Sequence, residues 1–137
     1  MHNSIPNLKE RLLVTSSLSP PHSVRSWGRD IDKLYEGKCL VTGLTSSQTV
    51  LEKHHLYSQN DYPSLKLEVL NGVILSKDIH RYFHKIYQND VTPIEFLYFL
   101  KLLKTTRLRK ISNQIDLASY HVVFLHQQMK KKYNLML

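Results

Sequence analysis

Cysteine and long hydrophobic runs are scarce in this 137-residue sequence. Cys39 is its only cysteine, which excludes an intrachain disulfide and a zinc site built from four cysteines, and which agrees with a reducing compartment. No run of about 18 consecutive apolar residues occurs, so the sequence predicts no transmembrane helix and no membrane partner. The fold must therefore be stabilised by packing, or by a metal ion bound without thiolates.

Acidic residues are also few. The chain has 11 Asp and Glu against 19 Lys and Arg, which gives a formal net charge of +8 at pH 7. This excess of positive charge favours a polyanionic partner, nucleic acid above all. Basic side chains are concentrated at residues 104–110 and 130–132, although either run is equally typical of a solvated surface.

The first 22 residues are rich in serine, and Glu10 is their only carboxylate. They lack the continuous apolar stretch of a secretory signal. Paired prolines near their end mark a boundary. We therefore expect a flexible N-terminal arm over residues 1–22, with a transit peptide as the alternative. A domain over residues 23–103 and a basic helical extension over residues 104–137 are expected to follow.

The segment after this arm begins with a helical pattern and continues with β-type runs. Apolar residues recur at helical spacing over residues 24–35 and predict a short helix. Residues 39–41 and 49–56 are β-type runs separated by a turn-rich segment, which predicts an irregular hairpin.

A further strand and three helices are expected in the second half of the chain. Residues 73–75 predict a short strand, and Ser76 is expected to be the N-cap of the helix that follows it. Thr92 and Glu95 have the spacing of a capping box, which predicts the start of a mostly buried helix. A last helix is expected over residues 117–131. The fold class predicted from these elements is α+β.

Two histidine pairs are the main candidates for chemistry. Successive strand residues point to opposite faces, so His54 and His55 cannot serve one site in the same way. His80 and His84 lie four residues apart on one helix face, a spacing that can hold one metal ion. If this helix packs against the strand, one of the adjacent histidines completes a three-imidazole site. The other is then placed to act as a general base.

Either pair alone is a weak signal, because histidines four residues apart often occur by chance on exposed helix faces. The order of the features carries more weight. A His-His strand end, a loop, an Asn-Gly turn, a short strand and a helix with two histidines follow one another. The remaining four histidines are interpreted as surface or core residues.

The segments CLVTG, LEKHHLYS and NGVILSKDIHRYFH together resemble the HNH nucleases. Their ββα-metal fold occurs in phage and intron-encoded homing endonucleases, bacterial toxins and restriction enzymes. Asn71 is followed nine residues on by His80 and four further on by His84, as in the family pattern. The resemblance covers residues 24–99. It implies a small ββα-metal core with a flanking N-terminal helix and additional C-terminal helices.

The resemblance also implies a role for each motif residue. His54, His80 and His84 would bind one divalent metal ion, His55 would be the general base that activates water, and Asn71 would tie the loop between the strands and hold the backbone of the base. The family points to magnesium, with manganese or zinc as alternatives, although three imidazoles suit zinc, nickel or manganese better. The implied reaction is single-metal hydrolysis of DNA phosphodiester bonds that leaves 5′-phosphate and 3′-hydroxyl ends.

One feature of many HNH proteins is missing from the sequence. They hold a structural zinc on two CxxC pairs, whereas the matching positions here are Cys39 and Thr42, then Ser76 and Ile79. No structural zinc is therefore expected, and Cys39 is interpreted as a small buried side chain. Packing must replace the zinc, and Trp27 is a candidate.

The expected partner is double-stranded DNA. Basic side chains around the motif are expected to contact phosphates without reading bases. These candidate DNA contacts are Arg25, Arg29, Lys53, Lys77, Arg81 and Lys85. Glu52 lies on the strand face of His54 and is either an orienting partner for a ligand or a solvated residue. The basic extension is either a second DNA contact or a dimer surface, so monomer and homodimer both remain open.

The function expected is a metal-dependent DNA endonuclease, of the homing or nicking kind, inside the cell. Its location would be the cytoplasm or nucleoid of a bacterial or phage-infected cell, or an organelle such as a plastid. A non-catalytic nucleic-acid-binding protein that retains the ββα fold is the alternative. A structural module in which all four motif histidines bind zinc is a third interpretation, and it requires both His54 and His55 to turn inward.

Overall fold

The computed structural model describes residues 5–134. Within them the protein is of the mixed α+β class, with five α-helices and one two-stranded antiparallel sheet, which confirms the predicted class. The helices are α1 (Leu8–Ser17), α2 (Val24–Leu34), α3 (Lys77–Tyr87), α4 (Pro93–Thr105) and α5 (Ser112–Tyr133), and the strands are β1 (Leu51–His55) and β2 (Gly72–Ser76). Short 3₁₀ turns occur at Pro63–Leu65, Val69–Asn71 and Arg109–Ile111.

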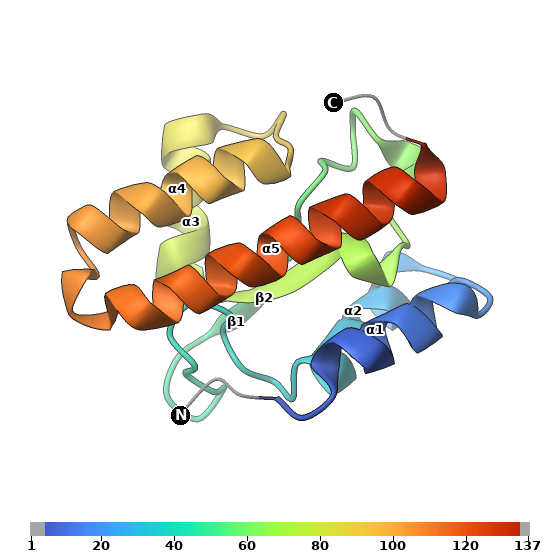
Figure 1. Ribbon diagram of the computed structural model, residues 1–137, viewed down its shortest axis with the longest axis horizontal. Coiled ribbons are helices and arrows are strands. Elements are labelled where there is room, and N and C mark those ends of the chain that lie inside the picture. Colours follow the sequence, from blue (N-terminus) through green and yellow to red (C-terminus); the bar gives the residue numbers. More distant parts are fainter. Residues whose placement is uncertain (1–4, 135–137) are drawn as a thin grey trace.

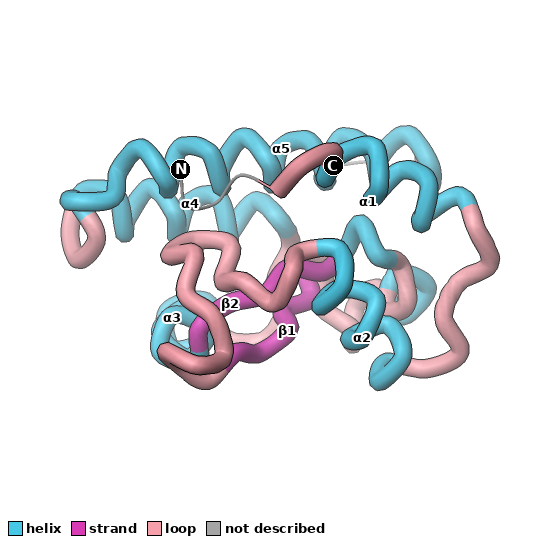
Figure 2. Tube along the Cα trace, turned by 90° about the horizontal axis from the view of Figure 1, so that it is seen from below, coloured by secondary structure: helices cyan, strands magenta, loops and turns pink. Residues whose placement is uncertain are grey.

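These elements form two layers (Figures 1 and 2). The sheet lies with α2 and α3 in one layer, and α1, α4 and α5 lie in the other. The long helix α5 crosses the molecule and packs against α4 and against the turn at Val69–Asn71. All five residues of β2 are therefore buried, whereas in β1 only His54 is buried and its neighbours are half-buried.

The two strands pair with a register that places His54 opposite Val73 and His55 opposite Gly72. Helix α3 begins directly after β2 and packs on both strands. The hairpin expected between residues 39–41 and 49–56 does not form, because the first run lies beside β2 instead. The amide of Leu40 donates to the carbonyl of Ile74 at 2.8 Å.

Capping predictions are right in position and differ in detail. The Thr92–Glu95 box is present, with the amide of Thr92 donating to the Glu95 carboxylate at 2.7 Å. Ser76 is the N-cap of α3, but its side chain makes no capping hydrogen bond. Its amide instead donates to the buried sulfur of Cys39 at 3.3 Å.

Within the described residues, side chains of α1 and α5 belong to the same hydrophobic core as those of the strands. Residues expected in a flexible arm form α1, and its Leu12 is fully buried. Helix α5 begins at Ser112 rather than at residue 117, and its Val122 and Leu125 are fully buried. One hydrophobic core contains all three of these side chains, because α1 and α5 cover the central turn at Val69–Asn71.

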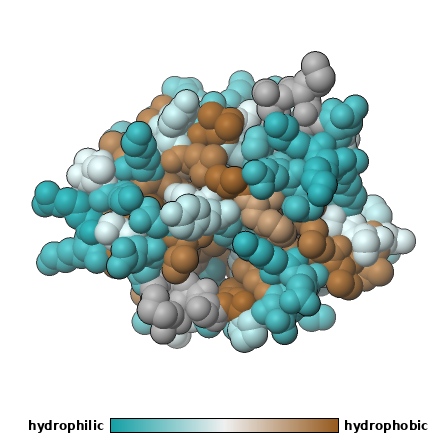
Figure 3. Space-filling view, viewed as in Figure 1, coloured by the Kyte–Doolittle hydropathy of each residue, from teal (hydrophilic) through white to brown (hydrophobic). Residues whose placement is uncertain are grey.

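Hydrophobic side chains also reach the surface of the outer layer. On the face that carries α4 and α5 they gather in a band across the middle of the molecule (Figure 3). Ile94, Leu117 and Val123 are exposed residues of these two helices. None of the helices between residues 5 and 134 is long and apolar enough to span a lipid bilayer.

Candidate metal centre

Three histidines converge where α3 packs on β1. His54 comes from the strand, and His80 and His84 come from successive turns of the helix. One ring nitrogen of each lies within 4.8 Å of the others. The structure thus brings together the three residues that were predicted as ligands.

Hydrogen bonds to the other ring nitrogens fix the tautomers of the two helical histidines. Nδ1 of His80 lies 2.9 Å from Oε1 of Glu52, and Nδ1 of His84 contacts the carbonyl oxygen of Gln88. A carboxylate and a carbonyl only accept, so both Nδ1 atoms carry the proton. In the neutral rings both Nε2 atoms then present lone pairs, and these two atoms lie 3.1 Å apart.

The separation of 3.1 Å between the two helical Nε2 atoms fits the binding of a single divalent ion. Imidazole nitrogens bind such metals at about 2.1 Å, so two ligands at roughly tetrahedral or octahedral angles lie about 3.0–3.4 Å apart. Nε2 of His54 is buried and has no hydrogen-bond partner in the described structure. A buried ring nitrogen without a partner is costly, and a metal ion would satisfy it.

Burial and proximity favour the neutral form of His54 and His80, the form that a metal ligand must have. Burial, followed by the charges of His80 and His84, holds the pKa of His54 well below its ordinary value. Burial also lowers the pKa of His80, and the Glu52 hydrogen bond only partly opposes this. Neutral imidazole is the form that binds a cation.

Backbone strain supports His84. Gln88 ends α3 with φ 65° and ψ −141°, a conformation that is costly for any residue except glycine. Its carbonyl is the acceptor for Nδ1 of His84. The strained residue therefore orients one of the three histidines, and no sequence pattern signals it.

His55 lies outside this cluster but beside the same hollow. A hollow of about 320 Å³ is lined by the three clustered histidines and by His55. Nε2 of His55 lies 2.9 Å from the carbonyl oxygen of Lys66, so this nitrogen carries the proton and Nδ1 has the free lone pair. Burial lowers the pKa of His55, and the bond to Lys66 partly opposes this. His55 does not join the cluster, so the geometry does not favour the four-histidine zinc module.

Asn71 ties together the loop that connects the strands. It is fully buried, and its Oδ1 accepts from the amide of Tyr57 at 2.8 Å. Its Nδ2 donates to the carbonyls of Tyr57 and Leu65, both at 3.1 Å. It thus fixes the backbone next to Lys66, the residue that accepts from His55.

The structure brings together three of the six predicted phosphate contacts. Arg25, Arg29, Lys53 and His55 line a second hollow of about 380 Å³, and Lys53 and His55 also line the first. Lys53 forms an ion pair of 2.8 Å with Asp32. The other three predicted contacts, Lys77, Arg81 and Lys85, line neither hollow.

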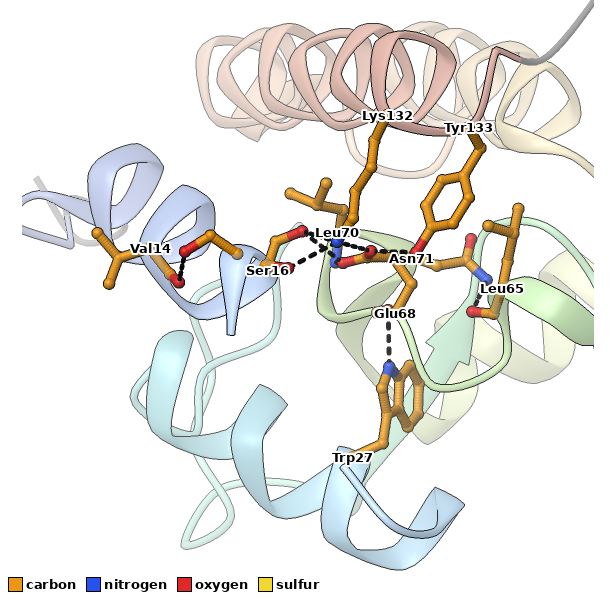
Figure 4. A network of polar contacts seen from close by, with 10 residues as sticks. Val14, Ser16, Trp27, Leu65, Glu68, Leu70, Asn71, Lys132 and Tyr133 are labelled. Atoms are coloured by element: carbon orange, nitrogen blue, oxygen red, sulfur yellow. Dashed lines mark hydrogen bonds and ion pairs between the residues drawn. The ribbon is translucent and has the colours of Figure 1, made fainter. Parts of the chain in front are cut away.

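The carboxylate of Glu68 is a structural centre that the sequence did not reveal (Figure 4). It accepts from Lys132 at 2.7 Å, Tyr133 at 2.6 Å and Ser16 at 2.9 Å, and so joins α5 to α1. Burial alone would raise the pKa of Glu68, but these bonds and one from the Leu70 amide outweigh it and lower the pKa. Lys132, one of the basic residues whose role the sequence left open, is therefore part of the fold.

Other basic residues of the C-terminal segment also have intramolecular partners. Lys104 forms an ion pair of 2.8 Å with Asp116, and Arg107 lies over the ring of Tyr82 at 4.1 Å. Their placement shows a role in packing and does not test a second DNA contact.

No protein-family model, curated protein or solved structure matches the chain.

Proposed function

We propose that the protein is a metal-dependent endonuclease of the HNH type, and that β1, β2 and α3 are its ββα-metal unit. One observation carries the proposal. Three converging imidazoles, two of them with fixed tautomers, share a hollow with a fourth imidazole, which is held apart from them with Nδ1 free.

His54, His80 and His84 would hold one divalent ion, of which magnesium is our first choice and manganese or zinc are alternatives. A bound ion of this kind neutralises the charge that builds up on the phosphate and the departing oxygen. Glu52 and Gln88 keep the helical histidines in the tautomer that this requires. Proton transfer and phosphate binding are assigned to the side chains around the hollow.

His55 is the proposed general base. Its Nδ1 takes a proton from water as the water oxygen bonds to phosphorus and the bond from phosphorus to the 3′ oxygen breaks. The departing 3′ oxygen takes a proton from solvent and leaves as a hydroxyl. The His55 ring becomes positive in this reaction, and the carbonyl of Lys66 then stabilises the imidazolium through Nε2. Asn71 supports this contact by holding the adjacent backbone at Leu65.

Double-stranded DNA is the proposed substrate. Arg25 and Arg29 are exposed at the second hollow, and Lys53 lies between this hollow and the histidines. Positive side chains in this position contact phosphates, so binding should weaken as salt rises. Lys53 would exchange Asp32 for a phosphate oxygen.

Cleavage of a supercoiled plasmid tests the proposal. We expect nicking with Mg²⁺ or Mn²⁺, loss of nicking on addition of a chelator, and a rate at least about 100-fold lower for His55→Ala. His22→Ala is the matched control, since His22 is exposed and lines neither hollow. Cleavage by His55→Ala at the parent rate would overturn the role of the base.

The alternative is a nucleic-acid-binding protein without activity. The net charge of +8 and the basic hollow favour nucleic-acid binding whether or not the histidines act. Salt-sensitive DNA binding by a protein that cleaves neither the plasmid nor a library of duplex sequences would select this alternative.

A further inference from the structure

The carbonyls of three residues close together in the loop each receive a side-chain N–H. Leu65 accepts from Asn71, Lys66 accepts from His55 at 2.9 Å, and Glu68 accepts from Nε1 of Trp27 at 2.9 Å. The tryptophan and the histidine are therefore anchored to the same short piece of backbone. Figure 4 shows the indole of Trp27 reaching from α2 to this loop.

The two anchored rings also stack on each other. The centroids of Trp27 and His55 lie 4.0 Å apart, and their planes differ by only 9°. Trp27 is 1% exposed, so the indole itself has no room to move. A Cβ on Gly72 would come within 2.3 Å of its six-membered ring, which shows how closely β2 approaches the indole.

A hydrogen bond at Nε2 alone does not fix an imidazole, because the ring can still rotate about the N–H···O axis. The lone pair of Nδ1 lies in the ring plane, so the plane decides where that lone pair points. A parallel aromatic ring in contact removes this rotation. The direction of Nδ1 is therefore set by two groups, the Lys66 carbonyl and the Trp27 indole.

We propose that Trp27 is a positioning residue for His55, which holds the imidazole plane so that Nδ1 faces the hollow of the clustered histidines. The inference rests on the proposed function, since it assigns to Trp27 a part in the same reaction. Trp27 itself touches neither the substrate nor the reacting atoms.

Two substitutions separate positioning from packing. Trp27→Phe keeps an aromatic ring and loses Nε1–H, whereas Trp27→Leu keeps an apolar side chain and loses the stack. We expect kcat to fall by about 30-fold or more in Trp27→Leu and by less than about 5-fold in Trp27→Phe. KM and DNA affinity should stay at the parent values in both. An equal loss of kcat in the two variants, or a loss expressed in KM, would overturn the inference.

Chemical rescue of His55→Gly gives a second measurement that needs no change at Trp27. Free imidazole should enter the space left between the indole and the Lys66 carbonyl. Trp27 is the only tryptophan in the chain, so its fluorescence reports this binding directly. We expect saturable quenching and a matching rise in cleavage at the same imidazole concentrations, and no rise for the double variant Trp27→Leu/His55→Gly.

The two readouts distinguish failure of the inference from failure of the proposed function. A parent protein that binds DNA but never cleaves it refutes the function, and the inference with it. A parent that cleaves, with a His55→Gly variant that shows no saturable quenching, refutes the inference alone. If Trp27→Leu does not fold, quenching and rescue of His55→Gly with the same midpoint support the inference, and different midpoints refute it.

Discussion

In this protein, single buried side chains make hydrogen bonds that hold together segments which neighbouring strands would hold together in a larger sheet. The loop between β1 and β2 has no strand partner, and Asn71 satisfies its backbone at Tyr57 and Leu65. Glu68 likewise joins α1 to α5 through Ser16 and Lys132, which lie 116 residues apart in sequence. The cost of changing either residue should therefore exceed that of a typical polar substitution.

Asn71→Ala should lower the free energy of unfolding by about 3 kcal/mol, because one amide and two carbonyls lose their buried partner. Urea denaturation measures the change. Asn113→Ala, an exposed position in α5, is the control and should change stability by less than about 0.5 kcal/mol. Equal effects at the two positions would show that the loop is not held by Asn71.

Glu68→Gln should lower the free energy of unfolding by about 3 kcal/mol, since it removes the charge that pairs with Lys132 in a site where the carboxylate is 3% exposed. Asp116→Asn removes an ion pair with Lys104 in which the Asp116 side chain is 38% exposed. It should lower the free energy of unfolding by less than about 1 kcal/mol. Thermal or urea unfolding of the two variants compares them directly. A smaller loss for Glu68→Gln than for Asp116→Asn contradicts this assignment.

At the scale of elements, capping residues and apolar spacing predicted the helices that such local patterns determine. The Thr92–Glu95 box and the apolar spacing of α2 placed two helices within a residue or two. Helix α1 was missed because Leu12 is its only buried residue, so its sequence has almost no amphipathic pattern. The pairing of β1 with β2 is a long-range contact that no short pattern encodes.

At the candidate site too, residues with a local pattern were predicted and those that depend on long-range contacts were not. Spacing was enough to select His80 and His84, because four residues on a helix are local geometry, whereas the choice of His54 over His55 came from the resemblance to the HNH nucleases. The supports were not found, since the Gln88 carbonyl and the Trp27 stack depend on how distant segments meet. Glu52 was weighed and left open, and the structure places it on Nδ1 of His80.

The contact between α2 and β2 yields a paired prediction on two glycines. In Gly72→Ala the new methyl group would lie 2.3 Å from the Trp27 ring, so we expect a loss of about 2 kcal/mol and a change in tryptophan fluorescence. In Gly28→Ala the nearest atom is Lys53 Cε at 3.7 Å, and the helix interior favours alanine. That variant should gain about 0.5–1 kcal/mol. Urea denaturation of both variants tests the opposite signs.

At the scale of the whole molecule, a chain of net charge +8 keeps several histidines neutral inside its core. His121 is the clearest case outside the candidate site. It is 8% exposed, and its Nε2 shares a hydrogen bond of 2.8 Å with the hydroxyl of Tyr35. Burial, helped by the charge of Lys9, lowers the pKa of His121 to about 4.

This pKa predicts a loss of stability in acid. Because the folded pKa lies below the ordinary value of 6.5, the unfolded chain binds more protons between these two values, and stability falls as pH drops from 6.5 to about 4. The gap is worth about 3 kcal/mol. Other buried histidines also contribute to the pH dependence of stability in the parent protein. The contribution of His121 is therefore the difference between the parent and His121→Phe.

Urea denaturation at pH 7 and pH 4 measures this contribution. The parent should lose about 3 kcal/mol more than His121→Phe over this interval. His22→Gln, at an exposed position, should follow the parent curve. Parallel curves for the parent and His121→Phe would show that His121 does not resist protonation.

The loop held by Asn71 has a consequence for the timescale on which this molecule moves. The amide of Tyr57 bonds to one side chain rather than to a strand, so its hydrogen exchanges only while Asn71 is released. Such a release also frees the backbone beside Lys66 and therefore the orientation of His55. The hydrogen-exchange rate of the Tyr57 amide therefore reports how often the loop opens and how long His55 stays oriented between openings.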